Sequence, residues 1–105
     1  MQVQCRIKGN TLYASLSGEL DDHSAPAVRN ELEKRLEDTR IMELALDMSG
    51  ITFMDSSGLG VVLGRYRTVT RRGGRLRIVG ASKYAQRILK MAGIYSLVNN
   101  GGGEL

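Results

Sequence analysis

The sequence predicts a single α/β domain built on a mixed β-sheet. Its 105 residues match the length of one ordinary domain. Segments with the period of a strand alternate with segments with the period of a helix, which indicates strands joined by helical connections. Two strand-like segments flank the turn residues Gly9-Asn10, so an N-terminal β-hairpin should supply an antiparallel pair. We expect helices packed on the sheet, a domain over residues 1–100 and a flexible glycine-rich tail over 101–105.

Two strands and a loop are expected at the start of the chain. Apolar and polar side chains alternate over residues 3–7 and again over residues 12–17, as they do in strands with one buried face. The run 18–23, which is mostly polar, is expected to form a loop.

A first helix should follow this loop. Ser24 or Ala25 would cap it, and Pro26 would lie in its first turn, where a missing N–H costs least. Apolar residues that recur every four positions predict the stripe facing the core: Val28, Leu32 and Leu36.

The middle of the chain predicts a strand and a second helix. Residues 43–48 are mostly apolar and indicate a strand inside the sheet, which the Ser-Gly pair at residues 49–50 should end. Apolar residues at helical spacing from Leu59 to Val69 predict a helix that ends near Arg71.

The last third predicts a strand, a third helix and a final strand. Two glycines at residues 73–74 should end the second helix, and residues 76–79 indicate a strand. Ser82 would cap the third helix, Gly93 suits its C-terminal end, and residues 97–98 indicate a short last strand. The buried side of the third helix is expected to comprise Tyr84, Ala85, Ile88, Leu89 and Ala92.

The composition excludes several classes of protein. A hydrophobic fraction of 42% and a charged fraction of 25% are typical of globular domains. No apolar run approaches the roughly 20 residues of a membrane-spanning helix, and no signal peptide opens the chain. A lone Cys5 forms no internal disulfide and suits the cytoplasm; with a lone His23 it offers too few ligands for the usual zinc site. We expect no metal, no cofactor and no membrane contact.

Enzyme activity is also not expected. A serine hydrolase needs a base near its nucleophile, and His23 is the only histidine in the chain. No Gly-x-Ser-x-Gly nucleophile elbow occurs. We therefore assign no catalytic residue.

Charge is distributed unevenly along the chain. The first 52 residues contain six Lys or Arg and nine Asp or Glu, whereas residues 53–105 contain nine and two. The basic second half could meet a polyanion, or its arginines could simply cover the solvent faces of helices. Because no aromatic platform is interleaved with these arginines and no phosphate-loop glycine-lysine motif is present, nucleotide or nucleic-acid binding is only an alternative hypothesis. The arginines concerned are Arg65, Arg67, Arg71, Arg72, Arg75 and Arg77.

The segment Asp55-Ser56-Ser57-Gly58 lies between a strand and the start of the second helix. The first turn of a helix leaves N–H groups unpaired and carries partial positive charge, so a phosphate is stabilised there. Either serine could instead serve as the helix cap, which contributes about 1 kcal/mol. Both roles remain open from spacing alone.

Glycines within the second helix allow two interpretations. Each costs up to about 1 kcal/mol relative to alanine inside a helix. Gly60 and Gly64 are four residues apart and share a face. That face could pack closely on the domain's own sheet, or it could be a flat docking surface next to the two serines.

Residues 53–66, with the sequence FMDSSGLGVVLGRY, resemble the signature of bacterial anti-sigma factor antagonists of the STAS family. The resemblance is closest to the sporulation branch of that family. Similarity at residues 18–21, 73–74 and 91–94 extends it over nearly the whole chain. The family usually continues into another C-terminal helix, whereas a strand and a tail are expected here.

The resemblance implies a binding protein controlled by phosphorylation. In the family, an anti-sigma factor that is itself a serine kinase holds a sigma factor inactive. The unphosphorylated antagonist binds this kinase and releases the sporulation sigma factor, without contacting nucleic acid itself. The kinase phosphorylates the serine directly after the motif aspartate, which is Ser56 here, and a serine phosphatase reverses the reaction. Ser57 is then expected to be the helix cap.

Two further readings stay open. The domain could be a STAS signalling module of a general stress-response partner-switching system. Asp21 could bind a basic group of the kinase, or it could be a charged loop residue that stabilises a helix start. Asp55 could help to hold Ser56 for phosphoryl transfer, or it could be an ordinary aspartate that stabilises the turn. The residues expected to bind the partner are Asp21, Asp55, Ser56, Ser57, Gly58, Gly60 and Gly64.

Overall fold

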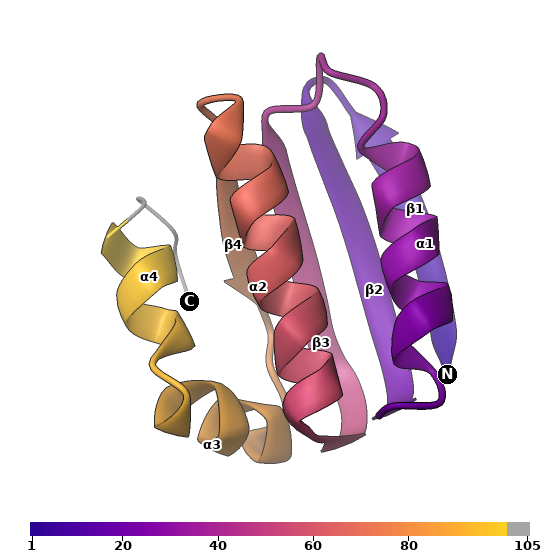
Figure 1. Cartoon of the computed structure of the whole chain (residues 1–105), viewed down its shortest axis with the longest axis vertical. Coiled ribbons are helices and arrows are strands. Elements are labelled where there is room, and N and C mark those ends of the chain that lie inside the picture. Colours follow the sequence, from indigo (N-terminus) through magenta and orange to yellow (C-terminus); the bar gives the residue numbers. More distant parts are fainter. Residues whose placement is uncertain (101–105) are drawn as a thin grey trace.

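The fold is the expected α/β domain with one mixed sheet. The computed structural model describes residues 1–100, with side chains described up to residue 98. The tail expected over residues 101–105 lies outside the described residues. Within the described part, four strands form a sheet in the order β1-β2-β3-β4 (Figure 1). No helix in this part is both long enough and apolar enough to span a membrane.

The strands pair as a hairpin followed by parallel crossovers. Strand β1 (Gln2–Lys8) pairs antiparallel with β2 (Thr11–Leu20). Gly9 turns the hairpin with a φ of 62°, in the left-handed region that favours glycine. Strand β2 pairs in parallel with β3 (Glu43–Met54), and β3 pairs in parallel with β4 (Arg75–Val79). The two parallel pairs are joined through helices, as such pairs require.

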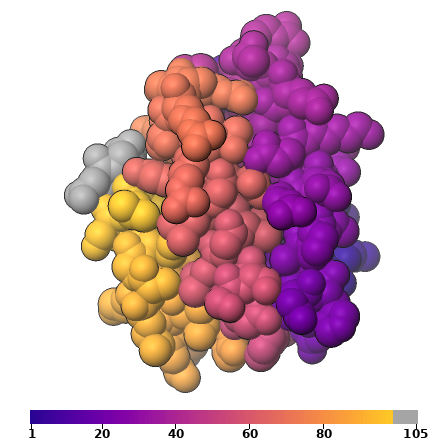
Figure 2. All heavy atoms as spheres, viewed as in Figure 1, coloured from indigo at the N-terminus to yellow at the C-terminus, as the bar shows by residue number. Residues whose placement is uncertain are grey.

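Helices cover one face of the sheet and its β4 side. Helices α1 (Ala25–Arg35) and α2 (Ser56–Arg71) lie side by side over the sheet, and their atoms form a continuous surface (Figures 1 and 2). Helix α3 (Lys83–Met91) lies at the end of the domain where β3 ends, and α4 (Ile94–Asn100) lies beside β4 (Figure 1). The expected stripe of α1 is confirmed as part of the core. Its members are Val28, Leu32 and Leu36.

Two strands are longer than predicted. The loop expected from residue 18 begins only after Leu20, and β3 continues through Ser49 and Gly50 instead of ending there. The β2–β3 register shifts between Ser15 and Ser17 and again beyond Gly18, so the pair absorbs an irregularity without breaking. A Cβ on Gly50 would lie 2.6 Å from the Cβ of Ser17, so Gly50 permits the two strands to approach closely.

The last element is a helix, so the strand predicted at residues 97–98 is wrong. Gly93, with a φ of 75°, ends α3 and lets the chain turn into α4. Ile94 and Val98 are four residues apart and both are buried, which is helical spacing. The chain therefore continues after α3 as helix α4.

The buried sides of the helices also differ from expectation in places. On α3, Ala85 and Leu89 are buried, but Tyr84 is 37% exposed and Ala92 is also exposed. Ser24 precedes α1, yet its side chain caps no helical N–H. Its Oγ instead donates to the carbonyl of Glu19 (2.7 Å).

Several arginines of the basic second half are used inside the fold. The guanidinium of Arg65 is buried and pairs with Glu33 of α1 at 2.9 Å. Arg72 donates to three backbone carbonyls between residues 36 and 41. Because these groups already hold helices and loops together, they are not available to a polyanion.

Glu43 joins the amino-terminal ends of three strands. Its carboxylate accepts hydrogen bonds from Thr11 of β2 (3.1 Å) and from Arg75 (2.6 Å) and Arg77 (3.3 Å) of β4. Burial raises the pKa of Glu43, but the hydrogen bonds and the charge of Arg77 outweigh it, so this pKa lies below its usual value.

This arrangement predicts a pH-dependent contribution to stability. The ionised carboxylate accepts the bonds, so the stabilisation is present above about pH 4.5, the ordinary pKa, and is lost as pH falls through the lowered pKa of the folded state. Glu43→Gln should reduce the free energy of unfolding at pH 7 by about 1 kcal/mol. The difference from wild type should shrink as the pH falls below 4.5, which urea unfolding between pH 3 and 7 would measure.

Glu37→Gln is the matched control. The Glu37 side chain is exposed and forms no hydrogen bond or ion pair within residues 1–100. The free energy of unfolding of Glu37→Gln should equal that of the wild type at every pH. An equal loss in both variants would refute a special role for Glu43.

Candidate functional site

The carboxylate of Asp55 caps α2. Its Oδ1 accepts hydrogen bonds from the backbone N–H groups of Ser57 (2.9 Å) and Gly58 (3.3 Å), and its φ of −121° is that of extended backbone. The expectation that Ser57 caps the helix is therefore wrong, because the preceding aspartate already occupies the capping position. Ser56 and Ser57 are instead the first two residues of the helix.

The hydroxyl of Ser56 is accessible and has no structural duty. Ser56 is exposed, and its side chain takes part in no hydrogen bond within the described part of the chain. It lies at the amino-terminal end of a 16-residue helix, where the helix dipole favours an anion, although Asp55 already accepts from the N–H groups of Ser57 and Gly58. The position is therefore suited to carrying a phosphate.

The loops that carry Asp21 and Asp55 lie side by side. Leu20 and Met54 are partners in the parallel β2–β3 register, and each aspartate directly follows one of them. The carboxyl ends of parallel strands lie at the same end of a sheet, so the two loops meet there. The structure thus brings Asp21 to the same end of the domain as Ser56.

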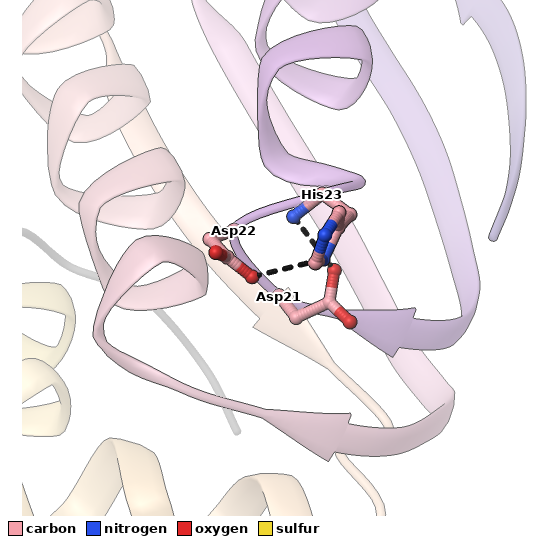
Figure 3. A group of neighbouring side chains, drawn as sticks. All are labelled: Asp21, Asp22 and His23. Atoms are coloured by element: carbon pink, nitrogen blue, oxygen red, sulfur yellow. Dashed lines mark hydrogen bonds and ion pairs between the residues drawn. The ribbon is translucent and has the colours of Figure 1, made fainter.

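Asp21 organises the start of α1. Its Oδ1 accepts a hydrogen bond from the backbone N–H of His23 at 3.0 Å (Figure 3). It also accepts one from the backbone N–H of Ser24 at 3.0 Å. The bond from Ser24, followed by that from His23, holds the pKa of Asp21 below its usual value despite some opposing desolvation. The carboxylate is therefore ionised at neutral pH and adds negative charge to this end of the molecule.

Asp21, Asp22 and His23 form the one cluster of metal-ligating groups in the described residues. One ligand atom from each lies within 4.8 Å of the others, and His23 Nδ1 is 3.1 Å from Asp22 Oδ1 (Figure 3). Asp22 and His23 are exposed, and Asp21 is already engaged by the turn. Local hydrogen bonds account for the cluster, so it gives no reason to assign a metal.

The glycines of α2 have different roles. Gly58 is buried, and a Cβ there would lie 2.6 Å from Met54 Cγ and 2.8 Å from the carbonyl oxygen of Leu20. Gly58 therefore lets α2 pack on the ends of β2 and β3, and this packing explains the glycine without a partner. A Cβ on Gly60 or Gly64 would meet nothing within 4 Å, so these two do not serve close packing on the sheet.

A flat strip thus runs along α2 from the exposed serine. Ser56, Gly60 and Gly64 succeed one another at four-residue intervals, which places them along one side of the helix. Gly60 is exposed one turn beyond Ser56, and Gly64 is half-buried one turn further along the helix. Packing on the sheet therefore does not explain Gly60 and Gly64, and their docking role stays a prediction.

Sequence reasoning missed a groove that borders Ser56. It measures about 330 Å³ and lies between the start of α2 and the end of α3. Met91 is 79% exposed and Ile88 is half-buried, although Ile88 was assigned to the core. The apolar spacing Tyr84, Ile88, Met91 was the available signal. The groove is lined by Met54, Asp55, Ser56, Leu59, Ile88, Met91 and Ala92.

Known proteins resemble the chain over nearly its whole length. The STAS domain model matches residues 2–101. An anti-sigma F factor antagonist from Paenibacillus polymyxa is 32% identical over 98 residues, which cover 93% of this chain and 84% of that protein. An anti-sigma-B factor antagonist from Bacillus subtilis is 27% identical over 99 residues, which cover 94% of this chain and 89% of that protein.

The fold resembles solved structures of the anti-sigma factor antagonist SpoIIAA. The unphosphorylated form matches with a TM-score of 0.79 and 26% identity, over 89% of this chain and 82% of SpoIIAA. The phosphorylated form, described as a Bacillus cell fate determinant, matches with a TM-score of 0.74 and 26% identity. The match covers 90% of this chain and 86% of SpoIIAA. These matches confirm the fold class and the resemblance drawn from residues 53–66. The chain belongs to the STAS domain family, among its anti-sigma factor antagonists.

Proposed function

We propose that this protein, when unphosphorylated, binds an anti-sigma factor that is a serine kinase and so releases a sporulation sigma factor. Phosphorylation of Ser56 by the kinase ends the binding, and a serine phosphatase restores it. The exchange takes place in the cytoplasm. The observation that carries the proposal is the exposed Ser56 hydroxyl, which Asp55 frees from capping and which borders both the glycine strip of α2 and the groove.

The domain itself can accept the modification. A phosphate on Ser56 adds a charge of about −1.5 to −2 and three strong acceptor oxygens. These lie at the positive end of α2 and on the surface, so no buried group has to move to receive them. The solved forms of SpoIIAA, unphosphorylated and phosphorylated, both match this fold, which supports a change that is local.

The partner, in contrast, is repelled. Gly60 and Gly64 let another surface approach α2 closely, and a dianion at Ser56 would then be enclosed without a compensating cation. Burying a charge in this way costs several kcal/mol. A loss of about 4 kcal/mol already weakens binding a thousandfold. We include Asp21, Asp55 and Ser57 in the same docking surface, because they lie beside Ser56 at this end of the domain.

A second candidate function is the same exchange in a general stress response. The 27% identity to an anti-sigma-B factor antagonist favours it, and the 32% identity to an anti-sigma F factor antagonist favours sporulation. The chemistry at Ser56 would be identical in both. The identity of the kinase that binds the protein separates the two.

Ser56 is expected to be the phosphate acceptor. After incubation with the kinase and ATP, mass spectrometry should find phosphate on Ser56 in the wild type and in Ser57→Ala, but none in Ser56→Ala. Ser56→Ala should stay bound to the kinase, and Ser56→Asp should bind at least tenfold more weakly because it places a charge in the contact. Phosphate on another residue, or loss of binding in Ser56→Ala, would contradict the proposal.

Gly58 and Gly64 should respond differently to substitution by alanine, because one packs against the strands and the other stands on the docking surface. Gly58→Ala should lower the free energy of unfolding by about 1–3 kcal/mol, because its Cβ collides with Met54 and with the backbone of Leu20. A Cβ at position 64 meets open space, and alanine forms helices better than glycine does. Gly64→Ala should therefore raise the free energy of unfolding by up to about 1 kcal/mol. It should nevertheless weaken kinase binding, because the added methyl group stands on the strip. Denaturant unfolding and calorimetric titration would measure the two effects. Unchanged binding in Gly64→Ala would exclude the strip from the interface.

A further inference from the structure

Helix α3 carries apolar side chains that the rest of the domain does not bury. Ala85 and Leu89 face the core, whereas Tyr84, Ile88 and Met91 follow one another at intervals of four and three residues beside them. Tyr84 is 37% exposed and Met91 is 79% exposed, the largest exposure among the large apolar side chains of the described residues. We call these three residues the apolar stripe of α3.

The apolar stripe reaches the Ser56 site. Ile88 and Met91 line the groove that Ser56 borders, and α2 contributes Leu59 to the same groove. At the other end of the stripe, the rings of Tyr84 and Phe53 stack with centroids 6.0 Å apart, and Phe53 is 40% exposed. Figure 2 shows α3 and the start of α2 next to each other on the surface. Exposed apolar groups that gather in this way are typical of an interaction site.

A row of cations borders the apolar stripe. Lys83, Arg87 and Lys90 repeat the same intervals on the neighbouring side of α3, and all three are exposed. None of them has a hydrogen bond or ion pair within residues 1–100, and α3 contains no acidic residue. These cations thus differ from Arg65 and Arg72, whose charges are used inside the fold.

We propose that this face of α3 is a second part of the docking surface, which receives an apolar side chain of the anti-sigma factor flanked by carboxylates. The proposal rests on the function proposed above and specifies the chemistry of that partner. An apolar side chain would fill the groove beside Ile88 and Met91, and the carboxylates would pair with Lys83, Arg87 and Lys90. A second copy of this chain fits less well, because two basic rows would face the same contact.

The charge of the partner would sharpen the response to phosphorylation. The groove joins Ser56 to the apolar stripe of α3, and the cations lie on the next side of that helix, so carboxylates held by them belong to the same partner surface that packs on Ser56. A phosphate on Ser56 then meets like charges as well as a closely packed surface. Binding should consequently depend on ionic strength, since charged rims mainly increase the association rate at low salt.

The test is the affinity of the full chain for its anti-sigma factor, measured by calorimetric titration at 50 and 300 mM salt. Met91→Glu should weaken binding at least tenfold, and Met91→Leu should stay within threefold of wild type. Ile7→Glu is the matched control, because Ile7 is 46% exposed on β1, at the other edge of the sheet. It should bind as wild type does. Arg87→Glu should weaken binding and reduce its dependence on salt. Thermal unfolding of each variant would verify that the fold is kept.

The outcomes separate the two proposals. If the wild type binds and Ser56→Asp does not, but Met91→Glu binds within threefold of wild type, the α3 surface is refuted and the proposed function stands. If the wild type binds no anti-sigma factor, both are refuted. If sedimentation shows that the wild type alone is a dimer and Met91→Glu a monomer, the stripe is a contact between copies and the α3 proposal fails.

Discussion

The parallel pairing of β2 and β3 is the constraint on which the site depends. Because Leu20 and Met54 are register partners, β2 and β3 end at the same end of the sheet, and the loops that follow them start side by side. Gly58 then lets α2 begin in direct contact with the two strand ends. The loop of Asp21, the cap of α2 and the exposed Ser56 therefore come together without a dedicated pocket. A shift of the register would move one loop away from the other and separate these groups.

Ser56 is available for modification because the neighbouring Asp55, and not Ser56, caps α2. Three consecutive residues, Asp55, Ser56 and Ser57, are all good helix caps. The aspartate takes the capping position, and its carboxylate accepts hydrogen bonds from the N–H groups of the first turn. The hydroxyl of Ser56 is therefore not needed as a cap. A modification at Ser56 can therefore change what the surface binds while the cap, and with it the helix, stays intact. Regulation and stability rest on different side chains.

The basic charge of the second half serves two purposes. Arg65, Arg72 and Arg77 pair with groups of the first half of the chain and stabilise contacts between elements. These contacts engage the three guanidinium groups inside the fold, which weakens the hypothesis of a nucleic-acid surface. The cations of α3 have no such partners in the described residues, and they border exposed apolar side chains. The same residue types are thus structural in one place and available to a partner in another.

The sequence by itself determined the order of most elements, the hairpin, the stripe of α1 and the motif around Ser56, because these follow from local period and from a contiguous run of residues. Tertiary structure decided the rest. Whether Gly50 breaks a strand or lets two strands approach depends on the neighbouring strand. Which of three capping residues is used depends on where β3 ends. Helix α4 and the exposure of Met91 depend on how much of each apolar face the sheet can cover. Local pattern states that a side chain is apolar, but only the packed neighbours determine whether it is buried or left for a partner.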